Sequence, residues 1–210
     1  MKTQPVRNYK SPLRAAHAQD TRERILEAVG KTLSGSTDGS ISFDQLAEES
    51  GVERRTVFRH FPNKEALLDA FWEWLNTRIS EKTLPSTLTD LLTLPERTFK
   101  GFDAQEGIIR ASLHTQSGRE MGLRSVSQRR KAFKAALQGV THGLPPKEIA
   151  RAEAAVQALF SAATWETLRD YCGLSGKEAG QTVSWAIWVI VEKLKRDART
   201  KSPKSSAQSQ

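Results

Sequence analysis

Apolar residues recur at spacings of three and four along most of the chain, which is the period of a helix with one buried side. The segment DTRERILEAVGKTL shows the pattern clearly, with a stripe formed by Ile25, Leu26, Val29 and Leu33. Asp20 and Glu23, three residues apart, form a capping-box pattern at its start. The pattern predicts a first helix that begins near Asp20 and ends before the loop-like stretch SGSTDGS.

The same period continues to the end of the chain. It predicts further helices over 42–50, 53–60, 64–81, 88–102, 106–115, 119–139, 146–171 and 176–197. Ser42 is placed to cap the second helix and Gly51 to end it. Alternation typical of strands, an internal repeat and a heptad run are all missing from the sequence. We therefore expect an all-α fold.

Composition narrows the class of protein. The chain has 210 residues and one cysteine, Cys172, so an intrachain disulfide is impossible and no cysteine cluster can bind a metal. The longest apolar run, WAIWVIV, has seven residues, which cannot span a bilayer, and the N-terminus lacks the apolar stretch of a secretory signal. We expect a cytoplasmic protein without a membrane partner.

Motifs of catalysis are missing as well. The sequence holds no G-x-S-x-G, GLSGKE fails the P-loop spacing, and four scattered histidines give no metal-binding spacing. We expect no catalytic residues, no metal and no cofactor, and hence no enzyme. The basic run RRKAFK at 129–134 is interpreted as exposed helix surface.

Charge is distributed in islands. Residues 1–19 carry a net charge of +4, residues 20–53 carry −5, residues 54–64 carry +4, and the chain from Glu192 onward carries +4 again. The third island has no acidic residue between Arg54 and Lys64. Basic islands of this kind favour contact with a polyanion at chosen places, although the C-terminal one is interpreted as solvated charge.

The acid-free island lies where two short helices meet at Gly51, which is a helix-turn-helix pattern. Residues 25–68, ILEAVGKTL…ISFDQLAEESGVERRTVFRHFPNKEALL, closely resemble the DNA-binding domain of tetracycline-repressor (TetR) family regulators. The matching positions are Ala47, Gly51, Val52, Thr56, Val57, Phe58, His60, Phe61, Lys64, Leu67 and Leu68. The resemblance implies an N-terminal three-helix helix-turn-helix DNA-binding domain followed by a helical ligand-binding and dimerisation domain.

Carried over by position, the resemblance assigns DNA contacts to the second helix of the pair. It makes base-facing candidates of Arg54, Arg55 and Phe58, and phosphate-contact candidates of Thr56, His60 and Lys64, with Arg59 beside them. Two positions depart from the common pattern, since many members have glycine or proline where this chain has Arg55 and tyrosine where it has Phe58. We expect Arg55 to read guanine and Phe58 to offer only apolar contact.

We expect four segments: a basic, disordered arm over 1–19, the DNA-binding domain over 20–66, the regulatory and dimerisation domain over 67–197, and a disordered tail over 198–210. The basic arm is either a minor-groove contact or an unstructured tail. Residues that could line an effector pocket are Trp72, Phe99, Phe102, His114, Phe133 and Trp165. Residues that could form a homodimer interface in the last helices are Val156, Leu159, Phe160, Trp185, Trp188 and Val189.

The sequence therefore favours a dimeric transcriptional regulator. Its partners would be a double-stranded DNA operator, a second copy of the chain and a small-molecule effector that releases the operator. The alternatives are a DNA-processing enzyme, or a helical interaction module, that uses the helix-turn-helix for docking.

Overall fold

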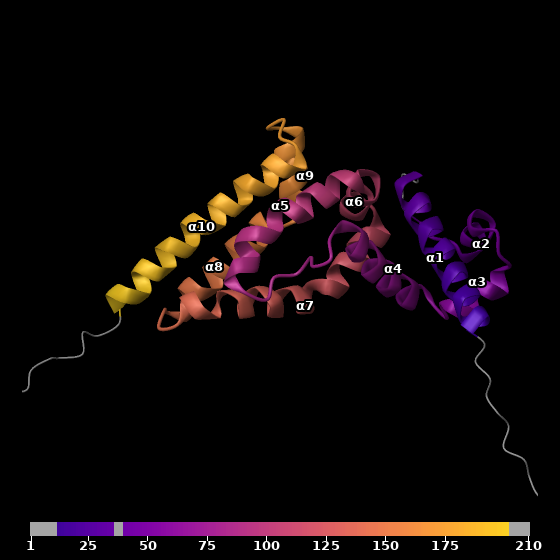
Figure 1. The fold of residues 1–210 in the computed structure, drawn as a ribbon, viewed down its shortest axis with the longest axis horizontal. Helices are drawn as coiled ribbons and strands as arrows, with labels where there is room; N and C mark the ends of the chain where they lie inside the picture. Colours follow the sequence, from indigo (N-terminus) through magenta and orange to yellow (C-terminus); the bar gives the residue numbers. More distant parts are fainter. Residues whose placement is uncertain (1–11, 36–39, 202–210) are drawn as a thin grey trace, which may run out of the picture.

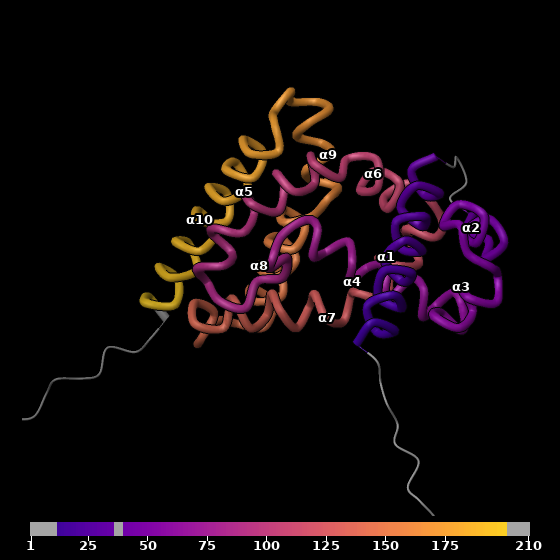
Figure 2. Tube along the Cα trace, turned by 45° about the vertical axis from the view of Figure 1, so that its right-hand side comes forward, coloured from indigo at the N-terminus to yellow at the C-terminus, as the bar shows by residue number. Residues whose placement is uncertain are grey.

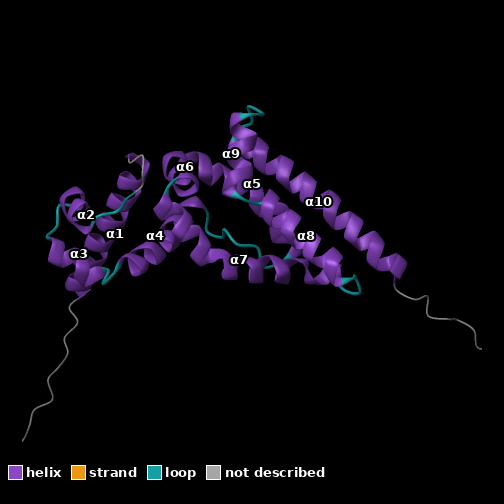
Figure 3. Ribbon diagram, turned by 180° about the vertical axis from the view of Figure 1, so that it is seen from behind, coloured by secondary structure: helices purple, strands orange, loops and turns teal. Residues whose placement is uncertain are grey.

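The computed structural model describes residues 12–35 and 40–201, and every regular element in these ranges is an α-helix. The helices are α1 (Pro12–Gly35), α2 (Phe43–Ser50), α3 (Arg54–His60), α4 (Lys64–Ile79), α5 (Leu88–Ala104), α6 (Glu106–His114), α7 (Gln116–Thr141), α8 (Pro146–Leu159), α9 (Ala162–Asp170) and α10 (Gly176–Lys201). Figure 1 shows α1 to α3 at one end of the molecule, here called the head, and α5 to α10 form the rest, here called the body, with α6 next to α1 of the head. The all-α prediction is confirmed for the described residues, as the view from behind in Figure 3 also shows.

The first helix begins earlier than predicted. It starts at Pro12, so residues 12–19 are helical and do not belong to a disordered arm. Proline fits the first turn of a helix because its missing N–H has no partner there, and the leucine, arginine and alanines that follow are good helix formers. The rest of the predicted arm, residues 1–11, lies outside the described residues.

Two other boundaries differ from the prediction. The helix predicted over 146–171 is two helices, because Phe160 leaves helical geometry and the Ser161 hydroxyl accepts a hydrogen bond from the Thr164 N–H at 3.2 Å, which caps α9. At the C-terminus, α10 continues to Lys201, so residues 198–201 are helical, and residues 202–210 lie outside the described residues.

The head is built around the apolar stripe of α1. Ile25, Leu26, Val29 and Leu33 are all buried, as predicted. They belong to one core with Leu46 of α2 and Val57 of α3. Each short helix thus contributes few buried residues, and the three depend on one another for their positions.

The body is held together mainly by α10 lying along α5, an arrangement that Figure 2 shows at the edge of the molecule. Gly176 and Gly180, one turn apart on α10, face the backbone of α5 at Phe99 and Glu96. A Cβ atom at either glycine would collide with that backbone, so the two helices approach closely. No helix within residues 12–35 and 40–201 has both the length and the apolar character needed to cross a membrane.

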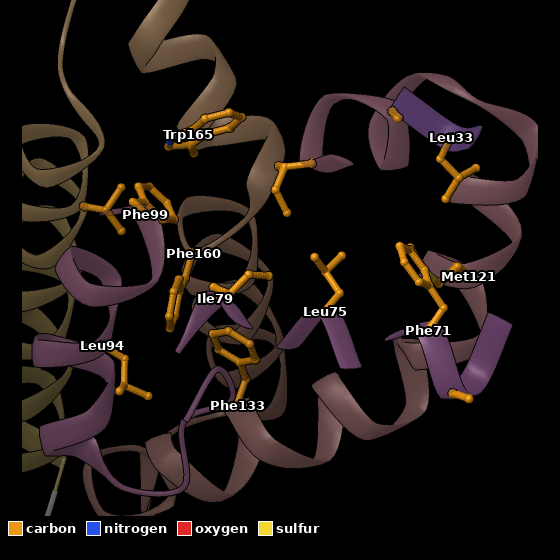
Figure 4. Close-up of a cluster of buried hydrophobic side chains, with 14 of the residues drawn as sticks. Leu33, Phe71, Leu75, Ile79, Leu94, Phe99, Met121, Phe133, Phe160 and Trp165 are labelled. Carbon is orange, nitrogen blue, oxygen red and sulfur yellow. The ribbon is translucent and has the colours of Figure 1, made fainter. Parts of the chain in front are cut away.

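Helix α4 joins the two parts. Its buried residues Phe71, Leu75 and Ile79 form a row that Figure 4 shows running from Leu33 of the head towards Phe133 of the body. The buried core is therefore continuous from one end of the molecule to the other. A displacement of α4 must disturb both parts, because packed cores deform little.

Candidate functional site

The turn between α2 and α3 sets the direction of α3. Gly51 ends α2 with φ of 66° and ψ of 36°, the left-handed conformation that glycine adopts without strain. Its N–H donates to the Glu48 carbonyl at 3.2 Å, and the Val52 N–H donates to the Ala47 carbonyl at 3.0 Å. The predicted helix-turn-helix is present, with Gly51 as the residue that ends the first of its two helices.

One side of α3 is buried and the other is exposed. Val57 is fully buried, and Phe61 just after the helix anchors its end. Arg54, Arg55, Phe58 and Arg59 are exposed, and this set is here called the recognition face. At about 100° per residue these four positions span about 140° of the helix, with Val57 on the far side. Four of the seven predicted DNA-binding residues thus share one exposed surface.

Arg54 and Phe58 are held in place by neighbours on α2. Arg54 Nε lies 3.0 Å from Asp44 Oδ1, and the Arg54 guanidinium lies over the Phe58 ring at 5.3 Å. The Phe58 ring stacks on Phe43 at 4.5 Å between centroids. The sequence pointed to an acid-free segment and did not reveal that Asp44, ten residues earlier, reaches it. Arg55 and Arg59 have no ion-pair partner among the described residues, so they are the cations of this face most available to a polyanion.

Thr56 and His60 are half-buried and lie outside the arc of the recognition face. Burial, followed by the charges of Arg59 and Arg22, lowers the pKa of His60 below 6.5. The imidazole is therefore neutral near pH 7, and its Nε2 is buried with no hydrogen-bond partner in the described part of the chain. A phosphate contact by His60 stays a prediction, and in this protonation state the imidazole would donate a hydrogen bond without forming an ion pair.

Lys64 connects α4 to the body. Its Nζ lies 2.9 Å from Glu120 Oε2 of α7, and about one turn further along α4 the Asp69 carboxylate accepts two hydrogen bonds of 2.6 Å from Arg124 of α7. The first turn of α4 is capped by Asn63, whose side chain accepts from the Ala66 N–H at 2.8 Å. Lys64 is thus placed both at the predicted phosphate contact and in an ion pair with the body.

A cavity of about 270 Å³ lies among α4 to α9. Two of the six predicted ligand-binding residues, Trp72 and Phe102, line it. Phe99, Phe133 and Trp165 do not line it, because they are packed in the core behind its wall. His114 is exposed, with Nε2 2.8 Å from Glu166 Oε1, and it does not line the cavity either. Aromatic residues on a helix stripe were more often core than lining, which a stripe alone does not distinguish.

Arg129 is a lining residue that sequence reasoning missed. The prediction placed it on exposed surface with the rest of RRKAFK, but it is half-buried and lines the cavity. A signal was present: residues 121, 125, 129 and 133 lie four apart, and Met121, Ser125 and Phe133 are all buried. Position 129 therefore falls on the buried stripe of α7, and only its neighbours in the run face outward.

The predicted dimer residues divide into two groups. Val156 and Phe160 are buried within the chain, so these two assignments were wrong; Phe160 instead lines the cavity. Trp185 and Trp188 on α10 are 66 % and 50 % exposed, beside exposed Val189, and Leu159 of α8 is half-buried. An exposed cluster with two tryptophans is unusual for a lone chain and typical of a contact surface.

The head matches a known family of sequences. Residues 39–71 match the model of the bacterial regulatory proteins of the tetR family. The chain is 33 % identical over 67 residues to the HTH-type transcriptional regulator AcrR of Shigella flexneri, which is 32 % of this chain and 31 % of that relative. It is 35 % identical over 83 residues to the nucleoid occlusion factor SlmA of Edwardsiella ictaluri (strain 93-146), which is 39 % of each chain. The match thus spans between three and four tenths of the length of these relatives.

The whole fold matches solved structures of the same kind. NalD of Pseudomonas aeruginosa, described as the secondary repressor of the MexAB-OprM multidrug efflux pump, gives a TM-score of 0.61 at 20 % identity, over 82 % of this chain and 96 % of NalD. A tetR-family transcriptional regulator from Streptomyces coelicolor gives 0.56 at 17 % identity, over 90 % of this chain and 92 % of the other. At these identities the likeness establishes the fold alone. It includes the body, to which the match with the family model does not extend.

Proposed function

We propose that this chain is a DNA-binding transcriptional regulator of the tetR family, a repressor that a small-molecule effector releases from its operator. The observation that carries the proposal is the recognition face of α3. Arg55 and Arg59, which form no ion pair in the described part of the chain, project from a short helix whose orientation is fixed by the turn at Gly51. Such a helix fits the major groove, where arginines contact phosphates and guanine edges.

We propose that the regulator acts as a homodimer in the cytoplasm, where its operator is. The exposed residues Trp185, Trp188 and Val189 give α10 an apolar outer surface next to α8, and a two-fold pairing of these helices would cover it. Two heads on one symmetric dimer would contact two successive stretches of major groove. A near-palindromic operator follows from that symmetry.

Effector release would use α4. This helix carries Lys64 at its first residue, beside the recognition face, and Trp72 in the wall of the cavity. A ligand that shifts α4 would move the head relative to its partner and spoil simultaneous docking of both heads. The two sites would be coupled through α4, because this one rigid helix reaches both the DNA-binding head and the cavity.

The alternatives named from the sequence are less favoured. The relatives reported above are named as regulators or as a nucleoid occlusion factor, and NalD is named as a repressor. An interaction module that binds a protein through α3 would bind DNA no better than any other polyanion.

The test is to select binding sites for the full chain from a random duplex pool and to measure their affinity by fluorescence anisotropy at several salt concentrations. We expect inverted half-sites and an affinity that falls linearly with log salt. The double variant Trp185→Glu/Trp188→Glu should sediment as a monomer and lose affinity for the paired site, while its exposed positions leave the fold intact. A pool without enrichment would refute DNA recognition, and a variant that still sediments as a dimer would refute the α10 interface.

A further inference from the structure

The cavity has an uneven chemical character. Its walls are largely apolar, with Trp72, Met121, Phe102 and Phe160 among them, and Arg129 is the one ionised side chain among its described lining residues. An outer hollow shares Trp72 and Asn76 with it and adds further charged groups, which are Asp69, Glu73 and Arg124. The Asp69 carboxylate is already paired with Arg124, so the charges of the hollow are mostly satisfied at its rim.

Arg129 is under-satisfied where it stands. Its Nη2 donates to the Phe160 carbonyl at 3.1 Å, and its guanidinium lies 5.4 Å from the Phe133 ring centroid. A guanidinium has five N–H groups, and no carboxylate lies within ion-pair distance of this one in the described part of the chain. Burial lowers the pKa of Arg129, but a guanidinium stays charged near neutral pH. A half-buried cation without a counterion is only partly hydrated, so it favours an anionic partner.

A second polar group in the same wall lacks a partner. Thr98 of α5 is among the lining residues, and its hydroxyl is buried with no hydrogen-bond partner in the described residues. Buried hydroxyls almost always have a partner, which is protein, water or ligand. The cavity therefore offers one cation in largely apolar surroundings, with a buried, unpartnered hydroxyl in its wall.

We propose that this cavity binds a small amphipathic acid, with its anionic group on Arg129 and its apolar body against Trp72 and Phe102. This inference rests on the proposed function, because it takes the cavity to be the effector site and specifies the chemistry of the effector. The volume of about 270 Å³ equals that of about nine water molecules at about 30 Å³ each, which suits a ligand of about that many non-hydrogen atoms. A medium-chain fatty acid or a monocyclic or bicyclic aromatic acid has this size.

The charge of the ligand distinguishes this proposal from its rivals. A neutral apolar ligand would gain nothing from Arg129, and an amphipathic cation would be repelled by it and would be drawn to Glu73 in the outer hollow. The guanidinium also has a purely structural task, because its contact with the Phe160 carbonyl caps the end of α8. That task alone predicts lower stability when Arg129 is lost and no change in ligand preference.

The experiment compares octanoate, 1-octanol and octylamine by isothermal titration calorimetry with the full chain in the absence of DNA. We expect octanoate to bind on the order of ten- to a hundredfold more tightly than the alcohol, as a charge-assisted hydrogen-bonded pair gives. Arg129→Met should abolish this preference and leave octanol binding unchanged. Arg129→Lys should retain part of the preference, and Arg130→Met, the exposed neighbour on α7, should retain all of it.

Retention of the preference in a folded Arg129→Met variant overturns the proposal, and so does either of two results with the wild type. Octanol or octylamine binding the wild type as tightly as octanoate would do so, and so would octanoate failing to bind at its solubility limit. The preference in the wild type needs no variant, so it decides the matter even if Arg129→Met fails to fold, which circular dichroism would reveal. Octanoate that binds as expected but leaves operator affinity unchanged contradicts effector release under the proposed function and leaves the ligand chemistry standing.

Discussion

The recognition face and the cavity both present arginine, but different levels of structure place the two. Arg55 and Arg59 stand on a helix of seven residues, exposed to water, and their positions follow from the adjacent turn and from buried Val57. Arg129 lies against Phe133 on its own helix and against the end of α8, which is distant in sequence. The first arrangement is local, whereas the second exists only after several helices have packed.

This difference sets what each arginine can do. Charges in water are screened, so the recognition face acts through many weak contacts whose sum depends on salt. A partly desolvated charge interacts more strongly with one partner and is screened less. DNA affinity should thus be spread over several residues, and ligand choice should be concentrated in one.

The largest expected effect is that Arg55 and Arg129 contribute differently to operator affinity. Arg55→Ala should weaken binding to the selected operator by about 1–3 kcal/mol in each half-site and relax discrimination at one base pair. Arg129→Met should leave operator affinity in the absence of effector unchanged. Anisotropy titrations on operator and random duplexes measure both. Equal losses on the two duplexes for Arg55→Ala would mean that this residue contacts phosphate and reads no base.

The head was the part of the molecule that the sequence could predict. The turn at Gly51, buried Val57 and exposed Arg54, Arg55 and Phe58 all follow from residues within a short window, where local geometry decides the outcome. Even there Asp44 was missed, because an ion pair across two helices depends on their crossing. The early start of α1 was also missed, because a plausible capping box at Asp20 outweighed the proline eight residues before it.

The cavity was predictable only in part. Trp72 and Phe102 do line the cavity, but an apolar residue on a stripe faces core and cavity alike until the neighbouring helices are placed. Because the chain leaves helical geometry between α8 and α9, Phe160 points into the body and cannot contribute to a dimer surface. The spacing of buried residues on α7 indicated that Arg129 is on the inner side, but the basic character of RRKAFK led to the interpretation as exposed surface.

Two glycine substitutions test whether the turn at Gly51 depends on the local backbone conformation. Gly51→Ala should destabilise the protein by about 1–2 kcal/mol, because a side chain in the left-handed region is strained. Gly139→Ala is the matched control in the body, since Gly139 is helical and exposed, and a Cβ atom added there would meet no neighbouring atom within 4 Å; it should stabilise by about 0.5–1 kcal/mol. Thermal unfolding measures both changes in stability. If both substitutions stabilised or both destabilised the protein, the interpretation of the turn would be contradicted.

The smallest expected effect concerns the ion pair between the two regions. Lys64 Nζ is 2.9 Å from Glu120 Oε2, and its hydrogen bond, followed by that from Gln116, lowers the pKa of Glu120 below 4.5. If Lys64 contacts phosphate, Glu120 competes with DNA for the same ammonium group. Glu120→Gln should then tighten operator binding about two- to threefold at low salt, since exposed ion pairs are weak, and the gain should fade as salt rises.

The control for this change is Glu73→Gln, which alters the net charge equally on exposed surface of α4, where no ion pair forms among the described residues. A gain of the same size in both variants would mean that general charge is responsible and that the pair has no specific role. A gain confined to Glu120→Gln, and lost when Lys64→Ala is added, would establish that the body restrains the head through this lysine. Effector binding could then act by strengthening the Lys64–Glu120 ion pair. Helix α7 carries both Glu120 and Arg129, and it contacts α4 and lines the cavity.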